Sequence, residues 1–147
     1  MDRKKKTPKK ILLVNWVKEH REEIEAFLRE KGFEVIATGD YLEIKSLLNK
    51  KPNWILIEPN AQWPDGLEEE TEYGRITGLV ILKHIKQNQS DLQLPPVIVL
   101  SVVQKRLIDD LEVSKNVGVV DVLEIPIPAN KLLTSINKAL KQNRRKF

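Results

Sequence analysis

The feature that most constrains the fold is an alternation of short apolar runs with longer amphipathic segments along the chain. Five runs rich in β-branched and other apolar residues have the length of buried strands: residues 10–14, 33–38, 54–57, 97–101 and 118–125. Helically spaced apolar residues follow each run, in segments 17–31, 77–89, 105–115 and 130–143 and in one that begins at Asp40. Crossovers of this kind join parallel strands in right-handed βαβ units, so the pattern predicts an α/β protein whose parallel sheet is covered on both faces.

The segment after the second predicted strand begins with a helix-capping pattern. Asp40 can cap the first turn, and Glu43 stands three residues later, as in a capping box. We therefore expect a helix here, with Leu42, Leu47 and Leu48 facing the core.

Length and composition favour one domain without covalent cross-links. A chain of 147 residues can bury an adequate core by itself, and with no cysteine it has neither disulfides nor thiolate metal sites. No apolar segment is long enough for a signal peptide or a membrane span, so we expect a cytoplasmic protein with no membrane partner.

Charge is distributed unevenly, and this distribution predicts the domain limits. Residues 1–10 and 138–147 each carry a net charge of +5, whereas residues 11–137 carry −6. We expect a flexible basic arm over residues 1–9, a folded domain over 10–141 and a basic tail over 142–147.

The third predicted strand ends in the most informative residue of the chain. The apolar run Trp54-Ile55-Leu56-Ile57 enters through Lys-Pro-Asn and stops at Glu58, which is followed at once by proline. In an open parallel sheet the carboxyl ends of the strands form the edge where ligands bind. Glu58 is therefore the first candidate for a functional side chain.

Four motifs resemble the receiver domain of two-component response regulators over about residues 10–141. The stretch 52–59 is similar to the strand that ends in the family's phospho-acceptor aspartate, and Thr77-Gly78-Leu79 is similar to the start of its third helix. Val99-Leu100-Ser101 and the stretch 118–126 resemble the family's fourth and fifth strands. The resemblance implies a CheY-like, three-layer (βα)5 flavodoxin-like doubly wound parallel sheet with strand order 2-1-3-4-5.

The same resemblance implies that the phosphorylation site is degenerate. The acceptor position holds Glu58, the family's acidic pair falls on Asn15 and Trp16, and its lysine falls on Ile125, while Ser101 keeps the family's residue type. The aromatic switch position of the fifth strand holds Val122. Phosphoryl transfer needs carboxylate-bound Mg²⁺ and a cation for the developing charge, so neither Mg²⁺ nor another cofactor is expected, and Glu58 is the single candidate metal ligand.

Each of these replacements has a structural interpretation. Glu58 could imitate a phosphorylated aspartate, or it could be a strand-end carboxylate bonded to the backbone. Trp16 could be an exposed binding aromatic or a lid over the vacated pocket, and Ile125 could simply extend the core.

The stretch between Glu58 and Ile76 is long for a loop in a compact domain, which indicates a functional or mobile segment. Trp63, Asp65 and Tyr73 make it a possible interaction loop, with packing onto the domain as the alternative. Its acidic residues 68–72 lack the spacing of a calcium loop, and a solvated charged loop is the simpler interpretation.

The remaining motifs give little support to catalysis. His20 and His84 lie on predicted helices without a nucleophile nearby, and no phosphate-binding glycine loop occurs, so an enzyme is not expected. The basic ends could bind nucleic acid, but no recognition element accompanies them.

The sequence thus predicts a stand-alone pseudo-receiver that signals by protein contact and is not phosphorylated in the usual way. Its partner would be a signalling protein or kinase, and segments 105–115, 118–125 and 130–143 could form a homodimer face. The alternatives are a divergent regulator still phosphorylated by a histidine kinase in a phosphorelay, and a nucleic-acid-binding accessory protein that uses its basic termini.

Overall fold

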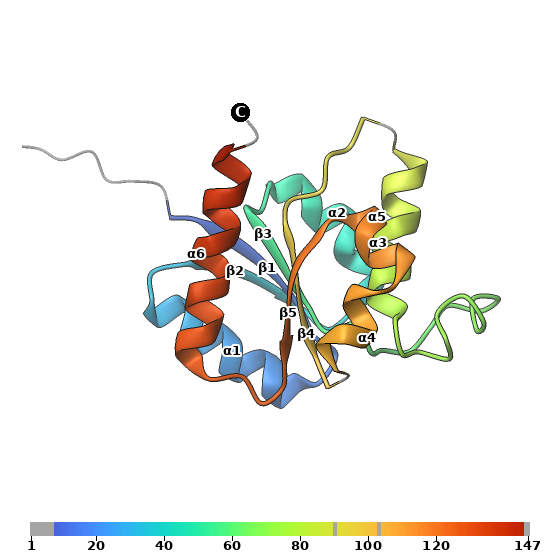
Figure 1. Cartoon of the computed structure of the whole chain (residues 1–147), viewed down its shortest axis with the longest axis horizontal. Helices are drawn as coiled ribbons and strands as arrows, with labels where there is room; N and C mark the ends of the chain where they lie inside the picture. The colour runs from blue at the N-terminus through green and yellow to red at the C-terminus, as the bar shows by residue number, and fades with distance from the viewer. Residues whose placement is uncertain (1–7, 90, 103, 146–147) are drawn as a thin grey trace, which may run out of the picture.

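The computed structural model describes residues 8–89, 91–102 and 104–145. Its centre is a five-stranded parallel sheet in the order β2-β1-β3-β4-β5 (Figure 1). The strands are β1 (Lys10–Val14), β2 (Glu34–Thr38), β3 (Trp54–Ile57), β4 (Val97–Ser101) and β5 (Val119–Glu124). The predicted fold class and strand order are confirmed.

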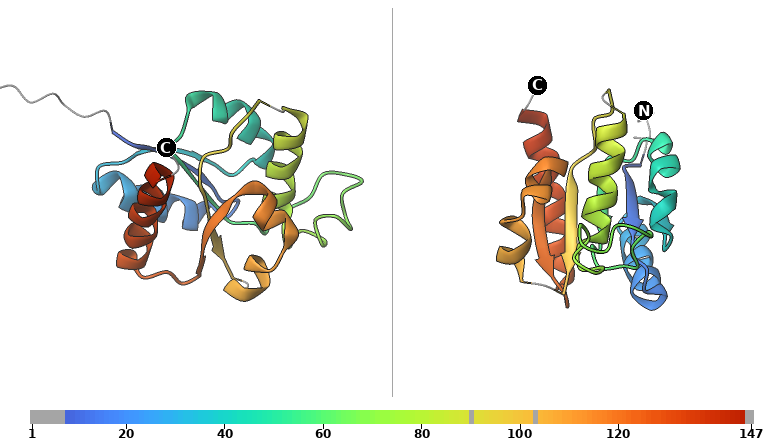
Figure 2. Two further views of the ribbon diagram at one scale, coloured as in Figure 1. Left: turned by 45° about the horizontal axis from the view of Figure 1, so that its top comes forward. Right: turned by 90° about the vertical axis from the view of Figure 1, so that its right-hand side faces the viewer.

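Helices cover both faces of the sheet (Figure 2). On one face lie α1 (Lys18–Glu30) and α6 (Ala129–Arg145), and on the other α2 (Ile44–Leu47), α3 (Thr77–Asn88), α4 (Lys105–Asp109) and α5 (Glu112–Val117). Short 3₁₀ turns, η1 (Tyr41–Glu43) and η2 (Leu48–Lys50), flank α2.

Two apolar cores result from the alternation of side chains along the strands. Leu12 and Ile55 belong to the core beneath α3, whereas their neighbours Leu13 and Leu56 belong to the core beneath α1 and α6. Because both faces of the inner strands are buried, β1, β3 and β4 are nearly continuous apolar runs, whereas the edge strand β5 contains Asp121 and Glu124.

The segment after β2 differs from its prediction. Leu42 is 73% exposed, and Tyr41 occupies the inward position that we expected Leu42 to take. The first turn is 3₁₀ and closes on the Asp40 side chain, which accepts the Leu42 N–H at 3.0 Å, so the inward face shifts by one residue. Glu43 does not complete a capping box, because it accepts the Thr38 hydroxyl at 2.6 Å.

The segment predicted as one helix over 105–115 is two helices. Leu111 has an extended backbone between α4 and α5. The buried Ser114 hydroxyl donates to the Ile108 carbonyl at 2.6 Å and satisfies the end of α4 after the break.

Both predicted basic ends lie partly outside the described residues. Of the predicted arm, residues 1–7 lie outside them, as do residues 146–147 of the predicted tail. Helix α6 continues to Arg145, into the segment that we assigned to the tail. Within the described parts of the chain, no helix has the length and apolar character needed to span a bilayer.

Candidate functional site

The carboxyl ends of the strands bring Asn15, Glu58, Ser101 and Ile125 to one edge of the sheet. The Asn15 N–H donates to the Thr38 carbonyl at 3.1 Å, and the Glu58 N–H donates to the Val14 carbonyl at 2.9 Å. At the other side of the site, the Ile125 N–H donates to the Ser101 carbonyl at 2.8 Å. The residues that correspond to the receiver phosphorylation site therefore follow the ends of neighbouring strands.

Glu58 is a buried carboxyl group, with 6% of the residue exposed. Its Oε1 accepts the Asn60 N–H at 3.1 Å, and no Lys, Arg or His among the described residues forms an ion pair with it. Burial removes water from the ionised form and raises the pKa of Glu58 to about 7, and the Asn60 amide offsets only part of that effect. Glu58 is thus half protonated near neutral pH.

Tyr41 is a site residue that the sequence did not reveal. Its buried hydroxyl donates to the Glu58 main-chain carbonyl in a short hydrogen bond. Burial raises the pKa of the Tyr41 phenol, and the nearby Glu58 carboxylate raises it further. Tyr41 therefore stays neutral and fixes the end of β3. The only sequence signal is an aromatic residue directly after the Asp40 cap.

Asn15 and Arg21 lie together at the end of β1, where the resemblance predicts an acidic pair. The Arg21 guanidinium donates to the Asn15 carbonyl at 2.8 Å, and the Val17 N–H donates to Asn15 Oδ1 at 2.9 Å. A Cβ at Gly39 would lie 2.4 Å from Arg21 Nη1, so glycine there lets the guanidinium cross to the end of β1. Asn15 Nδ2 is the one buried side-chain polar atom without a hydrogen-bond partner among the described residues.

Few of these side chains offer an oxygen ligand to a divalent cation. Glu58 supplies a carboxylate, Asn15 Oδ1 already accepts a backbone N–H, and Trp16 supplies no ligand. No group of three or more His, Asp or Glu side chains suitable for a metal ion occurs in the described part of the chain. Mg²⁺ in proteins is usually bound through one or two carboxylates and keeps several waters, and among Asn15, Trp16 and Glu58 the single carboxylate is that of Glu58.

Trp16 does not close over the site. It is 53% exposed and lines a hollow of about 290 Å³ beside Tyr41 and Trp63. Ile125 is partly buried and packs against the core beneath α1 and α6, and Val122 is buried in the opposite core. The positions of the family's lysine and aromatic switch thus contribute to apolar packing.

The loop over residues 59–76 is fastened to the domain at both ends. The Ala61 N–H donates to the Gly74 carbonyl at 3.0 Å, and the Thr77 hydroxyl donates to the Ala61 carbonyl at 2.8 Å. Glu70 accepts Lys83 at 2.5 Å and meets His84 Nε2 at 3.0 Å, which ties the middle of the loop to α3. His84 therefore has a structural contact, whereas His20 is exposed.

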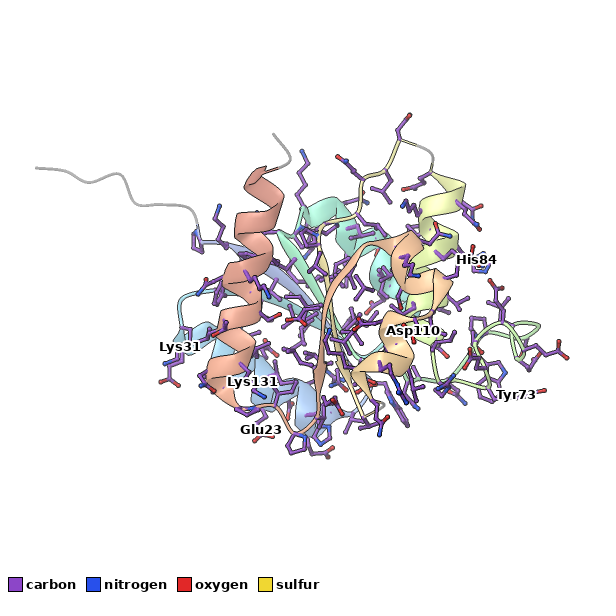
Figure 3. The ribbon with its side chains drawn as sticks, viewed as in Figure 1. Glu23, Lys31, Tyr73, His84, Asp110 and Lys131 are labelled. Carbon is purple, nitrogen blue, oxygen red and sulfur yellow. The ribbon has the colours of Figure 1, made fainter. Side chains whose placement is uncertain are left out.

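Of the three predicted interaction residues in this loop, Asp65 and Tyr73 are exposed and Trp63 is partly buried. Tyr73 is 66% exposed and projects away from the sheet (Figure 3). Its ring packs edge-on against Trp63, with centroids 5.9 Å apart. The loop thus combines anchored ends with an aromatic pair.

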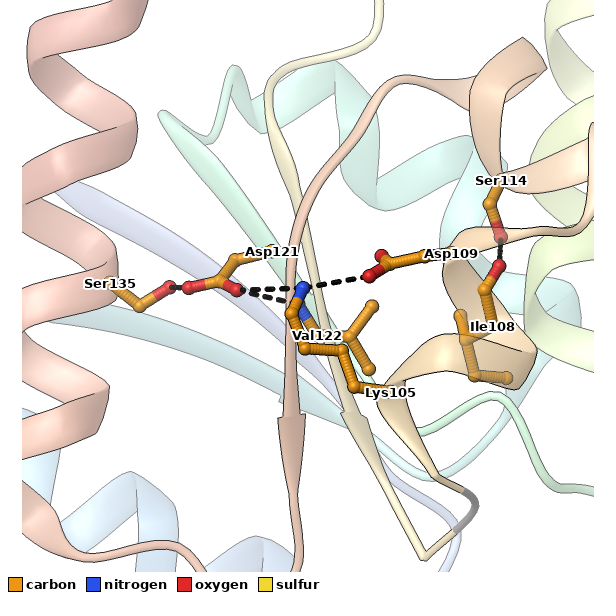
Figure 4. Close-up of polar contacts among 7 residues, drawn as sticks. All are labelled: Lys105, Ile108, Asp109, Ser114, Asp121, Val122 and Ser135. Atoms are coloured by element: carbon orange, nitrogen blue, oxygen red, sulfur yellow. Dashed lines mark hydrogen bonds and ion pairs between the residues drawn. The ribbon is translucent and has the colours of Figure 1, made fainter.

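A separate polar network joins α4, β5 and α6 (Figure 4). Lys105 pairs with Asp109 at 2.8 Å and reaches Asp121 Oδ1 at 3.6 Å, while the Ser135 hydroxyl donates to Asp121 Oδ2 at 2.6 Å. The Asp109 contact raises the pKa of Lys105. Asp121 therefore holds the two helices in a fixed relation to β5.

The comparisons with known proteins agree with this geometry at the level of the fold. No protein-family model matches the chain, and no curated protein matches it by sequence. A response regulator receiver domain protein from Clostridium thermocellum superposes with a TM-score of 0.69 at 20% identity, covering 95% of this chain and 99% of that one. The chemotaxis protein CheY4 of Vibrio cholerae gives 0.71 at 20% identity, covering 90% and 99%.

An archaeal neighbour extends the same result. A CheY-like receiver domain protein from Methanospirillum hungatei gives a TM-score of 0.70 at 18% identity, covering 96% of this chain and 100% of that chain. These neighbours match nearly their whole length, and their sequences differ from this one at about four positions in five. The chain has the CheY-like fold of response-regulator receiver domains.

Proposed function

We propose that this protein is a receiver-like signalling module that acts by protein contact and is not phosphorylated in the usual way. The observation that carries the proposal is the environment of Glu58, a buried carboxyl with one backbone partner, next to an edge where Arg21 and Asn15 stand in place of metal ligands. The receiver fold supports the signalling role.

The chemistry of phosphoryl transfer argues against Glu58 as an acceptor. Its extra methylene moves the carboxylate by roughly 1.5 Å relative to an aspartate. A misplacement of that size costs about 10²-fold in rate even when the other groups are present. Here no lysine stabilises the transferred group, because Ile125 packs into the core at that position.

The protonation of Glu58 also argues against phosphate mimicry. A phosphoryl group carries about −1.5 to −2 charges near neutral pH. Glu58, with a pKa of about 7, carries on average half a negative charge there. This supports the interpretation of Glu58 as a strand-end carboxyl bonded to the backbone.

The partner would be a signalling protein or a kinase, and two surfaces are available for it. One is the face of α4, β5 and α6, which the Asp121 network holds rigid and on which a second copy could pair. The other is the loop over residues 59–76, where the exposed Tyr73 packs against the partly buried Trp63. We propose no enzymatic activity, because the sequence offers no motif that pairs a nucleophile with a base.

A magnesium titration tests this proposal. Amide NMR signals of isotope-labelled protein are followed while Mg²⁺ is added, with a variant carrying Asn15→Asp, Trp16→Asp, Glu58→Asp and Ile125→Lys as the control that restores the receiver residues. We expect saturable shifts near residue 58 in the control alone. Saturable Mg²⁺ binding at Glu58 of the natural protein at physiological concentrations would favour the phosphorelay alternative.

A further inference from the structure

Exposed apolar side chains gather at one hollow beside the degenerate site. Six large apolar residues are exposed in the described part of the chain, and two of them, Trp16 and Leu42, line this hollow. Trp63 lines it from the opposite side, and the exposed Tyr73 packs on the outer edge of the Trp63 ring. Three segments distant in sequence thus place aromatic and aliphatic groups around one opening.

The hollow has the size of a socket for a side chain. Its volume is about 290 Å³, at the lower limit of the range typical of small-molecule and cofactor pockets. Tyr41, Ala61 and Ile81 are buried lining residues, and Pro64 completes the wall beside Trp63. One large apolar side chain of a partner protein fits this opening better than a whole cofactor.

The rim of this hollow, called the groove below, carries negative charge. Asp40 lines it, Asp65 follows Pro64 directly, and the Glu68 carboxylate accepts the Gly66 N–H at 3.0 Å close to Trp63. None of these carboxylates forms an ion pair with a lysine or arginine within the described residues.

Lys18 and Lys45 lie within three residues of Trp16 and Leu42 and are exposed, and neither forms an ion pair with Asp40, Asp65 or Glu68 among the described residues; three other cations of these segments are engaged elsewhere. Lys83 pairs with Glu70, Arg75 pairs with Glu72, and the Arg21 guanidinium donates to a backbone carbonyl. The charge of the groove therefore favours a partner segment that brings its own lysine or arginine.

The walls are held before any partner arrives. The Asp40 carboxylate fixes the Leu42 backbone at 3.0 Å, the Tyr41 hydroxyl binds the Glu58 carbonyl, and Thr77 holds the Ala61 carbonyl. Preformed walls lower the ordering cost of binding, so exposed aromatic groups on them contribute to affinity.

We propose that the groove between Trp16, Leu42 and Trp63 is the docking site for a basic segment of a partner protein. The segment inserts one large apolar side chain between the two indole groups and sets flanking lysine or arginine residues against Asp40, Asp65 and Glu68. This inference deepens the proposed function and rests on it, since it names the surface and the chemistry of the protein contact.

The test uses the full chain and three short capped peptides. The probe peptide has one phenylalanine between two pairs of lysines, the charge control has glutamates in place of the lysines, and the anchor control has alanine in place of the phenylalanine. Binding is measured by amide NMR shifts and by tryptophan fluorescence. We expect saturable binding of the probe alone, with shifts centred on residues 16, 39–42 and 61–64 and affinity that falls with added salt.

Variants assign the binding to the groove. Trp16→Ala and Leu42→Ala each remove an exposed side chain, so neither should disturb folding, and each should weaken the probe by about tenfold or more. Asp65→Asn should weaken it by a few fold, as expected for a rim charge. Leu107→Ala removes a side chain that is exposed outside the groove and should leave the affinity unchanged.

Three results would overturn the proposal: no saturable binding of the probe, equal binding of the glutamate peptide, or equal effects of Leu107→Ala and Trp16→Ala. This test is independent of the phosphorylation chemistry. If the natural protein binds both Mg²⁺ at Glu58 and the probe peptide, the proposed function is refuted and the groove proposal stands. If it binds neither, the groove proposal alone is refuted.

Discussion

Substitution of the buried Glu58 carboxyl should make the protein more stable at high pH. Burial raises the pKa of Glu58 from 4.5 to about 7. At 1.36 kcal/mol for each pKa unit, the folded protein favours the protonated carboxyl over the ionised one by about 3 kcal/mol. The raised pKa means that folding favours the protonated form. The stabilising contribution is fully present below pH 4.5 and is lost as the pH rises through about 7.

Glu58→Gln removes this pH dependence, because glutamine keeps an oxygen for the Asn60 N–H and cannot ionise. The free energy of unfolding of the variant minus that of the natural protein should therefore rise by about 2.5 kcal/mol between pH 5 and pH 8. Urea unfolding at a series of pH values measures it, and the difference cancels the titration of all other groups.

Glu69→Gln is the matched control, since Glu69 is an exposed carboxyl of the neighbouring loop. It should change the free energy of unfolding by less than about 0.5 kcal/mol. The reasoning would be refuted if the difference in free energy of unfolding between Glu58→Gln and the natural protein stayed constant across the pH range. That result would mean that water or a cation reaches the ionised carboxylate.

Three further substitutions test the surrounding contacts. Tyr41→Phe removes the buried hydroxyl bond to the Glu58 carbonyl and should lower the free energy of unfolding by about 1–2 kcal/mol in urea melts; an unchanged midpoint would contradict that bond. Glu70→Gln breaks the half-exposed tie between the loop and α3, so global stability should fall by only about 0.5 kcal/mol while amide exchange in residues 61–76 accelerates; unaltered exchange would show that the tie is not needed. Asp121→Asn weakens the contacts of β5 with Lys105 and Ser135 and should cost about 1 kcal/mol, and a double-mutant cycle with Ser135→Ala should show coupling, whereas strict additivity would contradict the network.

The fold could be predicted because each helix and strand has a recognisable pattern in its own stretch of sequence. Every strand is rich in apolar residues, and glycine or proline separates most of the elements, so the strands and the helices 77–88 and 18–30 follow from periodicity. The edge of the sheet that carries Glu58 follows from the parallel order alone.

The sequence prediction was wrong where the backbone of one residue decides which neighbouring side chains face the core. The 3₁₀ geometry after Asp40 rotates Tyr41 inward and Leu42 outward, against the helical spacing that placed Leu42 in the core. Because helical spacing did not place Tyr41 inward, its role at the end of β3 was not predicted. Similarly, the extended backbone of Leu111 divides a segment whose apolar spacing alone reads as one helix.

Contacts between distant segments could not be predicted from spacing. Arg21 reaches the end of β1 only because Gly39, from another loop, leaves room for its guanidinium. The packing of the long loop likewise decides that Glu70 pairs with Lys83 and His84. It also places Trp63 in the wall of the hollow that Trp16 lines. These tertiary arrangements define the groove and the charge of the site.

The measurement that tests the central claim most directly is the intact mass of the protein after incubation with acetyl phosphate and Mg²⁺, with the variant that restores the four receiver residues treated in parallel. The account predicts an unmodified natural protein, because Glu58 has neither the position nor the metal ligands for phosphoryl transfer. A stoichiometric, acid-labile phosphoryl adduct on Glu58 of the natural protein would contradict it.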